Sequence, residues 1–427
     1  MRQKELILYR NLPRQDIFDG MCRLMDGNSE TFVEDYYKLL GELAGVADQY
    51  GLYGNLWHAY LAYALTGHEN VFSLACEIRT GSLQDSKRDL AMHDFVILFE
   101  LMKYDFNQWL SYGIPKESLR WLSDYRNEDE KRKVINKRIR DRIMELAEVM
   151  GLLKEPEELY SHTVTFYREF GVGDLGLHKA FRLQHEEGED IRLLPATCTE
   201  HVYFKNLCGY ELQKQKLIAN TEAFLLGKPA NNCLLFGDAG TGKSSSVKAL
   251  LNEYYDRGLR MIEIYKHQFR DLNALIHMIQ NRNYKFIIFM DDLSFEEFEI
   301  EYKYLKAVIE GGLEKKPENV LIYATSNRRH LIREKFSDRD ERDEELHTND
   351  TVQEKLSLAY RFGVTIYYGK PDQKEFRQIV DQIAAEEQIT MPKEELYREA
   401  NAWELSHGGL SGRTARQFIM HLKGQMD

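Results

Sequence analysis

The chain has 427 residues, of which 43% are hydrophobic and 30% charged, and its formal net charge is −12. This balance is typical of a soluble protein with two or three domains and large hydrophobic cores. The acidic charge argues against a broad nucleic-acid surface, although it allows a local basic one. The five cysteines are scattered without a C-x-x-C pair, as expected for reduced thiols in a cytosolic protein.

Neither a signal peptide nor a membrane span is expected from the sequence. The first ten residues, MRQKELILYR, are charged throughout and contain no apolar signal-peptide core. The longest apolar stretch, around 95–98, is far shorter than the roughly 20 residues that a membrane span requires. We therefore expect a cytoplasmic protein without a membrane partner.

Residues 1–185 have the pattern of successive amphipathic helices. Apolar residues recur at spacings of three and four, as at Phe32, Tyr36, Leu39 and Leu43. Glycines interrupt these stretches, and no repeat of fixed period is visible, which leaves a solenoid unsupported. The pattern predicts an all-α N-terminal domain over 1–185.

The segment 128–150 predicts the clearest single helix of this region. Ile135, Ile139 and Ile143 fall on one stripe, and basic residues cover the other faces. A nucleic-acid contact is one interpretation of those basic residues. A solvated helix face is the other, and the acids interleaved over 128–142 favour it.

The character of the chain changes over residues 171–206. A cluster of glycines precedes the charged run HEEGED and then Pro195. Such a stretch is typical of a boundary between two folded units. We place a linker at 186–205.

From about residue 200 the chain alternates between strand and helix patterns. Near-continuous apolar strands separated by helices indicate a parallel sheet that is covered on both faces. We expect a five-stranded parallel sheet in an α/β domain over 206–370, followed by a helical lid over 371–427. The expected strands are 232–236, 261–265, 286–290, 320–325 and 365–368, and the expected helices are 243–256, 270–281, 297–311, 352–360, 372–387, 393–405 and 411–424.

The stretch NNCLLFGDAGTGKSSSV, residues 231–247, contains G-x-x-x-x-G-K-S between a strand and a helix pattern. Glycines let successive backbone N–H groups converge on phosphate oxygens, and the following helix directs its positive dipole end there. We expect Lys243 to reach the β- and γ-phosphates and the Ser244 hydroxyl to ligate Mg²⁺. The residues expected to bind the nucleotide here are Gly237, Asp238, Ala239, Gly240, Thr241, Gly242, Lys243, Ser244 and Ser245.

The third expected strand ends in Asp291 and Asp292. Ligands bind at the carboxyl ends of strands in open α/β sheets, so this acidic pair beside the phosphate loop predicts a magnesium site. We expect Asp291 to hold the metal together with Ser244, through water. Asp292 is expected to orient or deprotonate the attacking water, with Glu296 and Glu297 as rival bases further along the chain.

Three further polar residues follow or precede expected elements. Asn327 follows the fourth strand, Arg361 stands just before the last strand, and Arg413 opens the final helix. Negative charge is spread over the phosphoryl group in the transition state of phosphoryl transfer, and cations and polar groups must stabilise that charge. We therefore expect all three residues to take part in catalysis.

This combination of segments resembles the AAA+ ATPase module over about residues 200–427. GDAGTGKS resembles its Walker A motif, FIIFMDD its Walker B motif, ATSN its sensor 1, YRFG its arginine-finger segment and SGR its sensor 2. More narrowly, the runs NNCLLFGDAGTGKSS, DDLSFEE, YATSNRRHL and SGRTARQF resemble an uncharacterised family of bacterial AAA+ ATP-binding proteins.

The resemblance implies an ATPase whose cofactors are ATP and Mg²⁺. It implies that Gly209 and Tyr210 pack on adenine and that Arg413 senses the γ-phosphate from the lid of the same subunit. It also implies that Arg361 projects into a neighbouring subunit, which requires a homo-oligomeric ring or open spiral. Many members carry Glu where this chain has Asp292, and the shorter carboxylate suits slow hydrolysis, as in replication initiators and helicase loaders.

The main functional prediction is an oligomeric ATPase that remodels, loads or assembles an unidentified protein client recognised by the N-terminal helical domain. One alternative is a slow nucleotide-switched scaffold, and another is a DNA-linked initiator or helicase loader. Against the latter stand the net charge and the lack of a DNA-reading helix pair after the lid, although the basic run 328–330 favours it. Client threading is weakly supported, because Phe269 is the single candidate for a pore contact and a core contact is the alternative.

Overall fold

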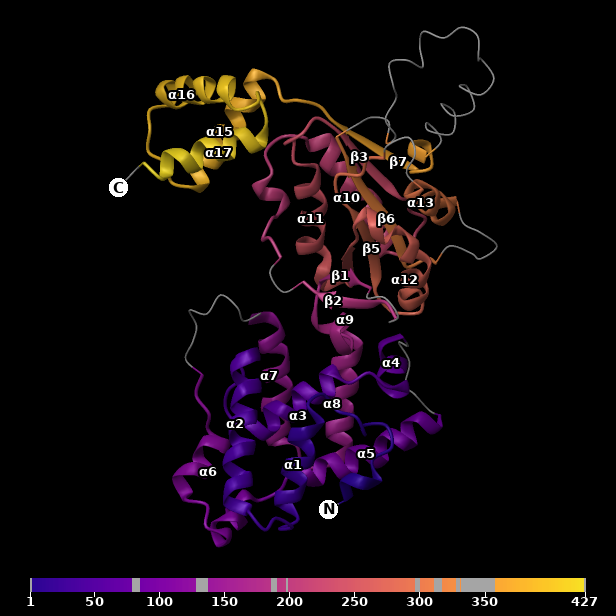
Figure 1. Ribbon diagram of the computed structural model, residues 1–427, viewed down its shortest axis with the longest axis vertical. Helices are drawn as coiled ribbons and strands as arrows, with labels where there is room; N and C mark the ends of the chain where they lie inside the picture. The colour runs from indigo at the N-terminus through magenta and orange to yellow at the C-terminus, as the bar shows by residue number, and fades with distance from the viewer. Residues whose placement is uncertain are drawn as a thin grey trace. The chain divides into compact units, whose positions relative to one another are not determined.

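The computed structural model describes residues 2–78, 85–127, 137–185, 190–196, 199–295, 300–310, 317–327, 331 and 358–425. The chain forms two compact units, Met1–His178 and Lys179–Asp427 (Figure 1). Each unit has its own hydrophobic core.

The first unit is helical, as predicted from its apolar spacing. Tyr36, Leu39 and Leu43 lie on the buried side of their helix, because residues at these spacings share one face. The helices are α1 (Gln15–Met25), α2 (Phe32–Tyr50), α3 (Leu56–Gly67), α4 (Val71–Ile78), α5 (Ser86–Met102), α6 (Lys116–Ser123), α7 (Lys137–Leu152), α8 (Pro156–Glu169) and α9 (Gly173–Leu177), with 3-10 helices η1 (Arg2–Glu5) and η2 (Phe106–Tyr112).

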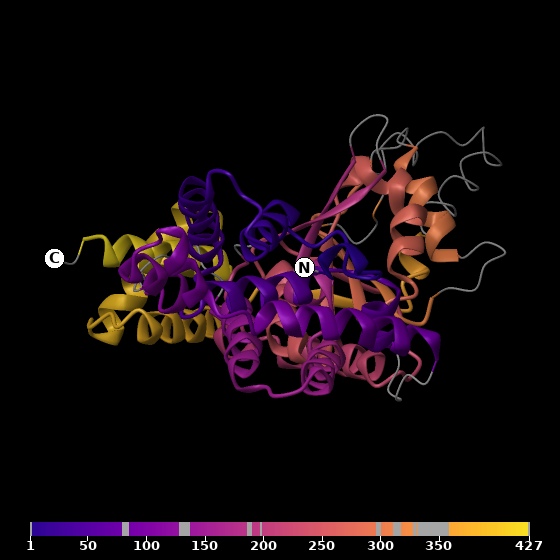
Figure 2. The same cartoon turned by 90° about the horizontal axis from the view of Figure 1, so that it is seen from below.

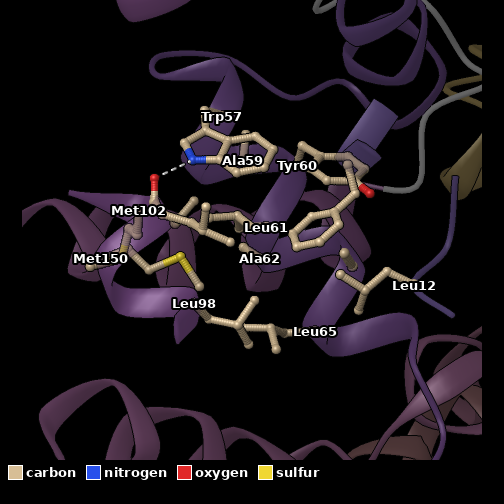
Figure 3. Packing of buried hydrophobic residues seen from close by; sticks show 14 of the residues in the cluster. Leu12, Trp57, Ala59, Tyr60, Leu61, Ala62, Leu65, Leu98, Met102 and Met150 are labelled. Atoms are coloured by element: carbon tan, nitrogen blue, oxygen red, sulfur yellow. Dashed lines mark hydrogen bonds between the residues drawn. The ribbon is translucent and has the colours of Figure 1, made fainter. Parts of the chain in front are cut away.

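Helix α3 forms the centre of the first unit. Trp57, Tyr60 and Leu65 are almost completely buried, and side chains on nearly all sides of the helix are apolar. The indole Nε1 of Trp57 donates a hydrogen bond of 3.0 Å to the carbonyl oxygen of Leu101, and Figure 3 shows the surrounding packing. A helix that is apolar all round must be enclosed by others, which explains why this unit needs several helices to cover it.

Helix α7 contains the described part of the basic helix predicted over 128–150; residues 128–136 lie outside the described residues. Its stripe of Ile139 and Ile143 is buried. The Arg142 guanidinium lies 4.1 Å from the centre of the Phe170 ring, and Arg138 donates a hydrogen bond of 3.1 Å to Leu177. These basic side chains therefore take part in packing within the first unit.

The second unit is built on a seven-stranded sheet in the order β2-β1-β4-β5-β6-β3-β7. The five predicted strands are present as a parallel core, and among the strands that the structure describes only the β1–β2 pair is antiparallel. The strands are β1 (Ala180–Gln184), β2 (Arg192–Pro195), β3 (Cys233–Gly237), β4 (Leu259–Glu263), β5 (Lys285–Met290), β6 (Val320–Ser326) and β7 (Val364–Tyr368).

Strands β1 and β2 extend the expected five-stranded sheet by two strands. β1 lies in the stretch expected to end the helical domain, and β2 lies in the expected linker 186–205. Phe181 of β1 pairs with Ile262 of β4, so this stretch belongs to the second unit, which begins at Lys179. Strands of five and four residues carry too little alternation to be recognised beside glycines and charges.

Helices cover both faces of the sheet, as predicted. Figure 1 shows α11 (Lys243–Tyr254) on one side, and α12 (Leu272–Ile279) and α13 (Glu301–Glu310) on the other. Helix α10 (Glu211–Leu225) shares a hydrophobic core with α11 and therefore covers the same face. Phe289 of β5 packs in one core with helices α10 and α11. Its neighbour Ile288 is also buried and points to the opposite face, because side chains alternate along a strand.

The C-terminal segment forms the expected three-helix lid, α15 (Gln373–Glu386), α16 (Lys393–Ser406) and α17 (Gly412–Lys423). Figure 2 shows these helices grouped around the C-terminus, in yellow. Phe376 and Phe418 lie in a small core that the lid helices share. The side chain of Ser411 accepts a hydrogen bond from the backbone N–H of Thr414, which caps the start of α17.

Candidate nucleotide-binding site

The phosphate loop connects the end of β3 to the start of α11, as predicted. Its three glycines, Gly237, Gly240 and Gly242, all have positive φ, of 134°, 75° and 89°. A side chain at Gly237 would overlap the backbone carbonyl of Tyr368 on β7, so glycine is required there. Within the same loop, Ala239 is exposed and Ser245 is half-buried.

Lys243 is 5% exposed and is the first residue of α11, directly after the loop. Its Nζ donates to the carbonyl oxygens of Gly237 at 3.1 Å and Asp238 at 2.6 Å, and to Oδ1 of Asn327 at 2.9 Å. Burial lowers the pKa of the Lys243 ammonium, and the neighbouring carboxylate of Asp292 opposes that shift. All three hydrogens of the ammonium group are thus directed at oxygens of this site.

The acidic pair follows β5 directly. Ser244 Oγ and Thr325 Oγ1 each donate to Oδ1 of Asp291 at 2.5 Å. Asp292 has a φ of 51°, a left-handed conformation that is uncommon for residues other than glycine but that Asp adopts more often than most. Its Oδ1 accepts a hydrogen bond of 2.7 Å from the amide of Asn327.

These contacts connect three segments that are far apart in the sequence. Lys243 is bonded to Asn327, and Asn327 is bonded to Asp292. Ser244 is bonded to Asp291. The phosphate loop, the acidic pair and the tip of β6 therefore form one hydrogen-bonded unit at the carboxyl end of the parallel strands, where ligands bind in such sheets.

The donor set fits magnesium bound with a nucleotide. Among the described residues no group of three or more His, Cys, Asp or Glu side chains could hold a metal ion by itself. Ser244 and Asp291 instead offer two hard oxygens side by side. Magnesium takes one or two protein oxygens and fills its remaining positions with water and phosphate, so this pair suits it.

The phosphate loop also contacts the lid and the segment that leads to it. The Asp238 carboxylate accepts a 3.0 Å hydrogen bond from the backbone N–H of Lys370. The carbonyl of Gly240 accepts a hydrogen bond of 3.2 Å from the backbone N–H of Arg413. The side chain of Arg413 is exposed at the start of α17. Thr241 is buried and donates to the carbonyl of Asp238. The lid is thereby attached to the loop through its backbone.

Gly209 and Tyr210 precede α10, and both have positive φ, of 75° and 60°. The Tyr210 hydroxyl donates a 2.7 Å hydrogen bond to the carbonyl of Gly369, and its ring lies 5.1 Å from that of Tyr368. Burial raises the pKa of this hydroxyl. The structure therefore places Tyr210 at the carboxyl end of β7, close to the loop; its contact with adenine stays a prediction.

Arg361 lies apart from these residues. It precedes β7, whose first residue, Val364, pairs with the start of β3, whereas the phosphate loop follows the end of β3. The length of the strand, about 13 Å at 3.3 Å per residue, separates the two edges. Arg361 forms an ion pair with Glu310 of α13. It cannot reach the phosphate loop of its own chain from this position.

Thr325 is a site residue that is not among those predicted from the sequence. It is 1% exposed and bonds to Asp291 through its hydroxyl. The available signal was its place among polar residues at the end of β6, one of which, Asn327, was recognised. The rival bases Glu296 and Glu297 and the basic run 328–330 lie outside the described residues.

The phosphate loop is joined by hydrogen bonds to an acidic pair and an asparagine at the strand tips, and a helical lid follows the sheet. This arrangement defines a P-loop nucleotide-binding protein of the AAA+ type. Residues 177–426 match the family described as "Protein of unknown function (DUF815)", so the chain belongs to that family. The expected resemblance to AAA+ ATPases is confirmed.

Comparison with solved structures found similarity to Thermotoga maritima RuvB. The structure of the RuvB Holliday junction branch migration motor aligns with 14% identity and a TM-score of 0.37, covering 52% of this chain and 64% of that one. A variant of the same RuvB aligns with 14% identity and a TM-score of 0.38, over 52% and 64%. The chain thus spans slightly less than two thirds of these structures. A comparison with curated proteins found no match.

Within the described parts of the chain, no helix combines the length and apolar character that crossing a membrane requires.

Proposed function

We propose that the chain is an ATPase that hydrolyses Mg-ATP to remodel, load or assemble a protein client recognised by its helical first unit. One observation carries the proposal. Lys243, Asn327 and Asp292 form a continuous hydrogen-bonded path from the phosphate loop to a carboxylate at the strand tips. Phosphoryl transfer requires this combination of a fixed cation, a polar positioning group and a base.

Each residue has a distinct task in the proposed reaction. The Lys243 ammonium balances phosphate charge, and the Asp292 carboxylate orients the attacking water and accepts its proton. Asn327 fixes the position of the Lys243 ammonium through its amide oxygen and of the Asp292 carboxylate through its amide nitrogen. When bound, magnesium supplies additional positive charge, and Ser244 and Asp291 are the residues that would hold it.

The proposal includes a homo-oligomer, which the position of Arg361 supports. Because Arg361 lies at the opposite edge of the sheet from the loop of its own chain, it could complete only the site of a neighbouring subunit. Arginines supplied in trans accelerate phosphoryl transfer by roughly 10³–10⁵-fold. A ring or open spiral would bring each Arg361 to the next site.

The nature of the client is constrained by two observations. Phe269, the candidate for a threading contact, is 1% exposed and packs against Phe295, which favours a core role and argues against threading through this residue. Arg138 and Arg142 pack within the first unit, which weakens the case for a nucleic-acid partner. A folded protein client is therefore the partner that we favour.

We also retain a cytoplasmic location as part of the proposal. Cys22, Cys76 and Cys233 are buried free thiols. Burial raises the pKa of the Cys22 and Cys76 thiols to about 12. Unreactive, unpaired cysteines suit a reducing compartment.

A slow nucleotide switch is the second candidate, and the lid contact favours it. The N–H of Arg413 is bonded directly to the carbonyl of Gly240, so a change in the phosphate loop would be transmitted to the lid. The short carboxylate of Asp292 also suits slow turnover. In a switch, the position that the lid takes when nucleotide is bound would control the protein's activity, and repeated hydrolysis would not be needed.

The ATPase rate per subunit, measured over a hundredfold range of protein concentration without any partner, tests the proposal. A rate per subunit that rises with concentration would support a site completed between subunits. A low, flat rate with tight Mg-ATP binding would favour the switch. The absence of both nucleotide binding and hydrolysis would overturn the proposal.

A further inference from the structure

We infer that Thr325 is a positioning residue for the Mg-ATP reaction, holding both carboxylates of the acidic pair in place. This inference rests on the proposed function. It adds a role for Thr325, a residue that contacts neither the phosphates nor the attacking water in the proposed reaction. Its basis is the set of bonds that one threonine makes to three successive residues after β5.

The register of the sheet brings Thr325 to this place. Met290, the last residue of β5, pairs with Ala324 of β6. The next residue on each strand, Asp291 and Thr325, therefore meet side by side. Thr325 is 1% exposed, so its hydroxyl is shielded from water and depends on protein partners.

Both capacities of the hydroxyl are used. Its hydrogen goes to Oδ1 of Asp291 at 2.5 Å, and its oxygen accepts the backbone N–H of Asp292 at 2.9 Å. The carbonyl of Thr325 also accepts the N–H of Leu293 at 2.6 Å. One residue thus fixes the side chain of Asp291 and the backbone of the two residues that follow it.

The bond to Asp292 matters because that residue is in a left-handed conformation, with a φ of 51°. A residue with a side chain keeps such a conformation only where its surroundings enforce it. The hydroxyl of Thr325 holds the N–H of Asp292, and Asn327 holds its carboxylate at 2.7 Å. Without the hydroxyl, Asp292 would keep the bond from its N–H to Oδ1 of Asp291, at 3.2 Å, and the bond from Asn327 to its carboxylate.

The bond to Asp291 matters for the metal-binding oxygens. Asp291 Oδ1 receives hydrogens from Thr325 and Ser244, both at 2.5 Å. When the Ser244 oxygen turns to a metal ion, the bond from Thr325 still orients the carboxylate. Residues that orient a metal ligand in this way typically contribute roughly 10–100-fold to metal affinity or activity.

Two substitutions separate the hydroxyl from the shape of the side chain. Thr325→Val keeps the branched shape but can neither donate nor accept, whereas Thr325→Ser keeps the hydroxyl. Thr221→Val is the matched control, because Thr221 is a buried threonine of α10 outside the site. Its hydroxyl bonds to Leu217 and Tyr323, both at 2.9 Å.

The experiment measures ATP affinity by calorimetry with excess Mg²⁺ and with EDTA, together with kcat, KM and the thermal unfolding midpoint of the full-length chain. We expect Thr325→Val to lower kcat by roughly 10–100-fold and to remove most of the affinity that Mg²⁺ adds. Its ATP affinity in EDTA should stay within about twofold of the parent, because Lys243 and the phosphate loop are intact. Thr325→Ser should restore both properties to within about threefold.

Thr221→Val should lower the unfolding midpoint without changing the Mg²⁺ effect. The inference is overturned if Thr325→Val keeps the parental Mg²⁺ effect, or if Thr325→Ser is as impaired as Thr325→Val. A parent chain that binds Mg-ATP without hydrolysing it would contradict the proposed ATPase activity only. The affinity measurements would then still decide whether Thr325 positions the acidic pair.

Discussion

The ammonium of Lys243 donates a 2.9 Å hydrogen bond to the side-chain oxygen of Asn327, a residue 84 positions away in the chain. The nitrogen of the same amide donates to Asp292 at 2.7 Å. The side-chain amide of Asn327 therefore contacts the phosphate-loop lysine through its oxygen and the acidic pair through its nitrogen. A change in either partner would alter the position of the second, which links nucleotide binding to the placement of the base.

Replacing Lys243 with alanine should abolish ATP binding. The substitution removes a buried cation bonded to three oxygens of the site, two of them carbonyls of the phosphate loop. We expect a loss of at least about a hundredfold in ATP affinity, since charge-assisted bonds in a buried site are among the strongest. Isothermal titration with Mg-ATP checks this, and tight binding by the variant would contradict the phosphate-loop assignment.

Lys248→Ala provides the control for that variant. Lys248 lies on the same helix, α11, and forms an ion pair of 3.2 Å with Glu200, a largely exposed residue. Exposed ion pairs contribute little, about 0–1 kcal/mol, so this variant should fold and bind ATP like the parent.

Replacing Asp292 with asparagine should separate ATP binding from hydrolysis. The amide keeps the size of the side chain but cannot accept the proton of the attacking water, so we expect kcat to fall by roughly 10²–10⁴-fold. The phosphate loop is unchanged, and ATP affinity should stay within about threefold of the parent. Single-turnover hydrolysis and calorimetry measure the two effects. Near-normal turnover would transfer the role of the base to Glu296 or Glu297.

The parts of the fold that depend on contiguous patterns could be predicted from the sequence. The phosphate loop is one continuous motif, and the buried strands β3, β5 and β6 are long apolar runs. Strands β1 and β2 could not be predicted in the same way. They are stabilised by pairing with β4, which is distant in sequence, and not by a local pattern.

The site shows the same division. Asp291, Asp292 and Asn327 could be anticipated because polar residues at the ends of parallel strands meet at one edge. The place of Thr325 among these polar residues was a signal of the same kind, but its bond to Asp291 depends on the register that pairs Met290 with Ala324. A shift by one residue would have turned its side chain to the other face of the sheet. Register is set by packing across the whole sheet, which a single sequence does not reveal.

Replacing Arg361 with alanine should leave ATP binding intact and slow hydrolysis. Arg361 lies at the opposite edge of the sheet from the loop of its own chain, so within its own subunit the variant loses the ion pair with Glu310 and no contact with the phosphate loop. We expect kcat to fall by roughly 10³-fold. Arg398→Ala, on the exposed surface of the lid, is the control.

Mixing the Arg361→Ala and Lys243→Ala variants tests whether the arginine acts between subunits. A mixed oligomer contains sites with an intact phosphate loop beside a subunit with an intact Arg361, so part of the activity should return. Steady-state ATPase assays on mixtures shown to co-assemble measure this recovery. Co-assembled mixtures without recovery would count against a role in trans.

Replacing Gly240 with alanine should release the lid from the phosphate loop. Gly240 has a φ of 75°, and a side chain there would lie 2.9 Å from Oγ of Ser411 and 3.1 Å from Cβ of Arg413. Gly227→Ala is the matched control, because Gly227 has a φ of 70° and no atom within 4 Å of an added Cβ. Both variants should lose about 1–2 kcal/mol of stability from the left-handed conformation.

Only Gly240→Ala should also break the bond between the Arg413 N–H and the Gly240 carbonyl, 3.2 Å in the parent. Amide hydrogen exchange over Gly412–Lys423, measured without nucleotide, should therefore accelerate in this variant and stay parental in Gly227→Ala. Measuring without nucleotide separates the lid contact from any direct effect on phosphate binding. Equal exchange in the two variants would show that the lid does not depend on its contact with the phosphate loop.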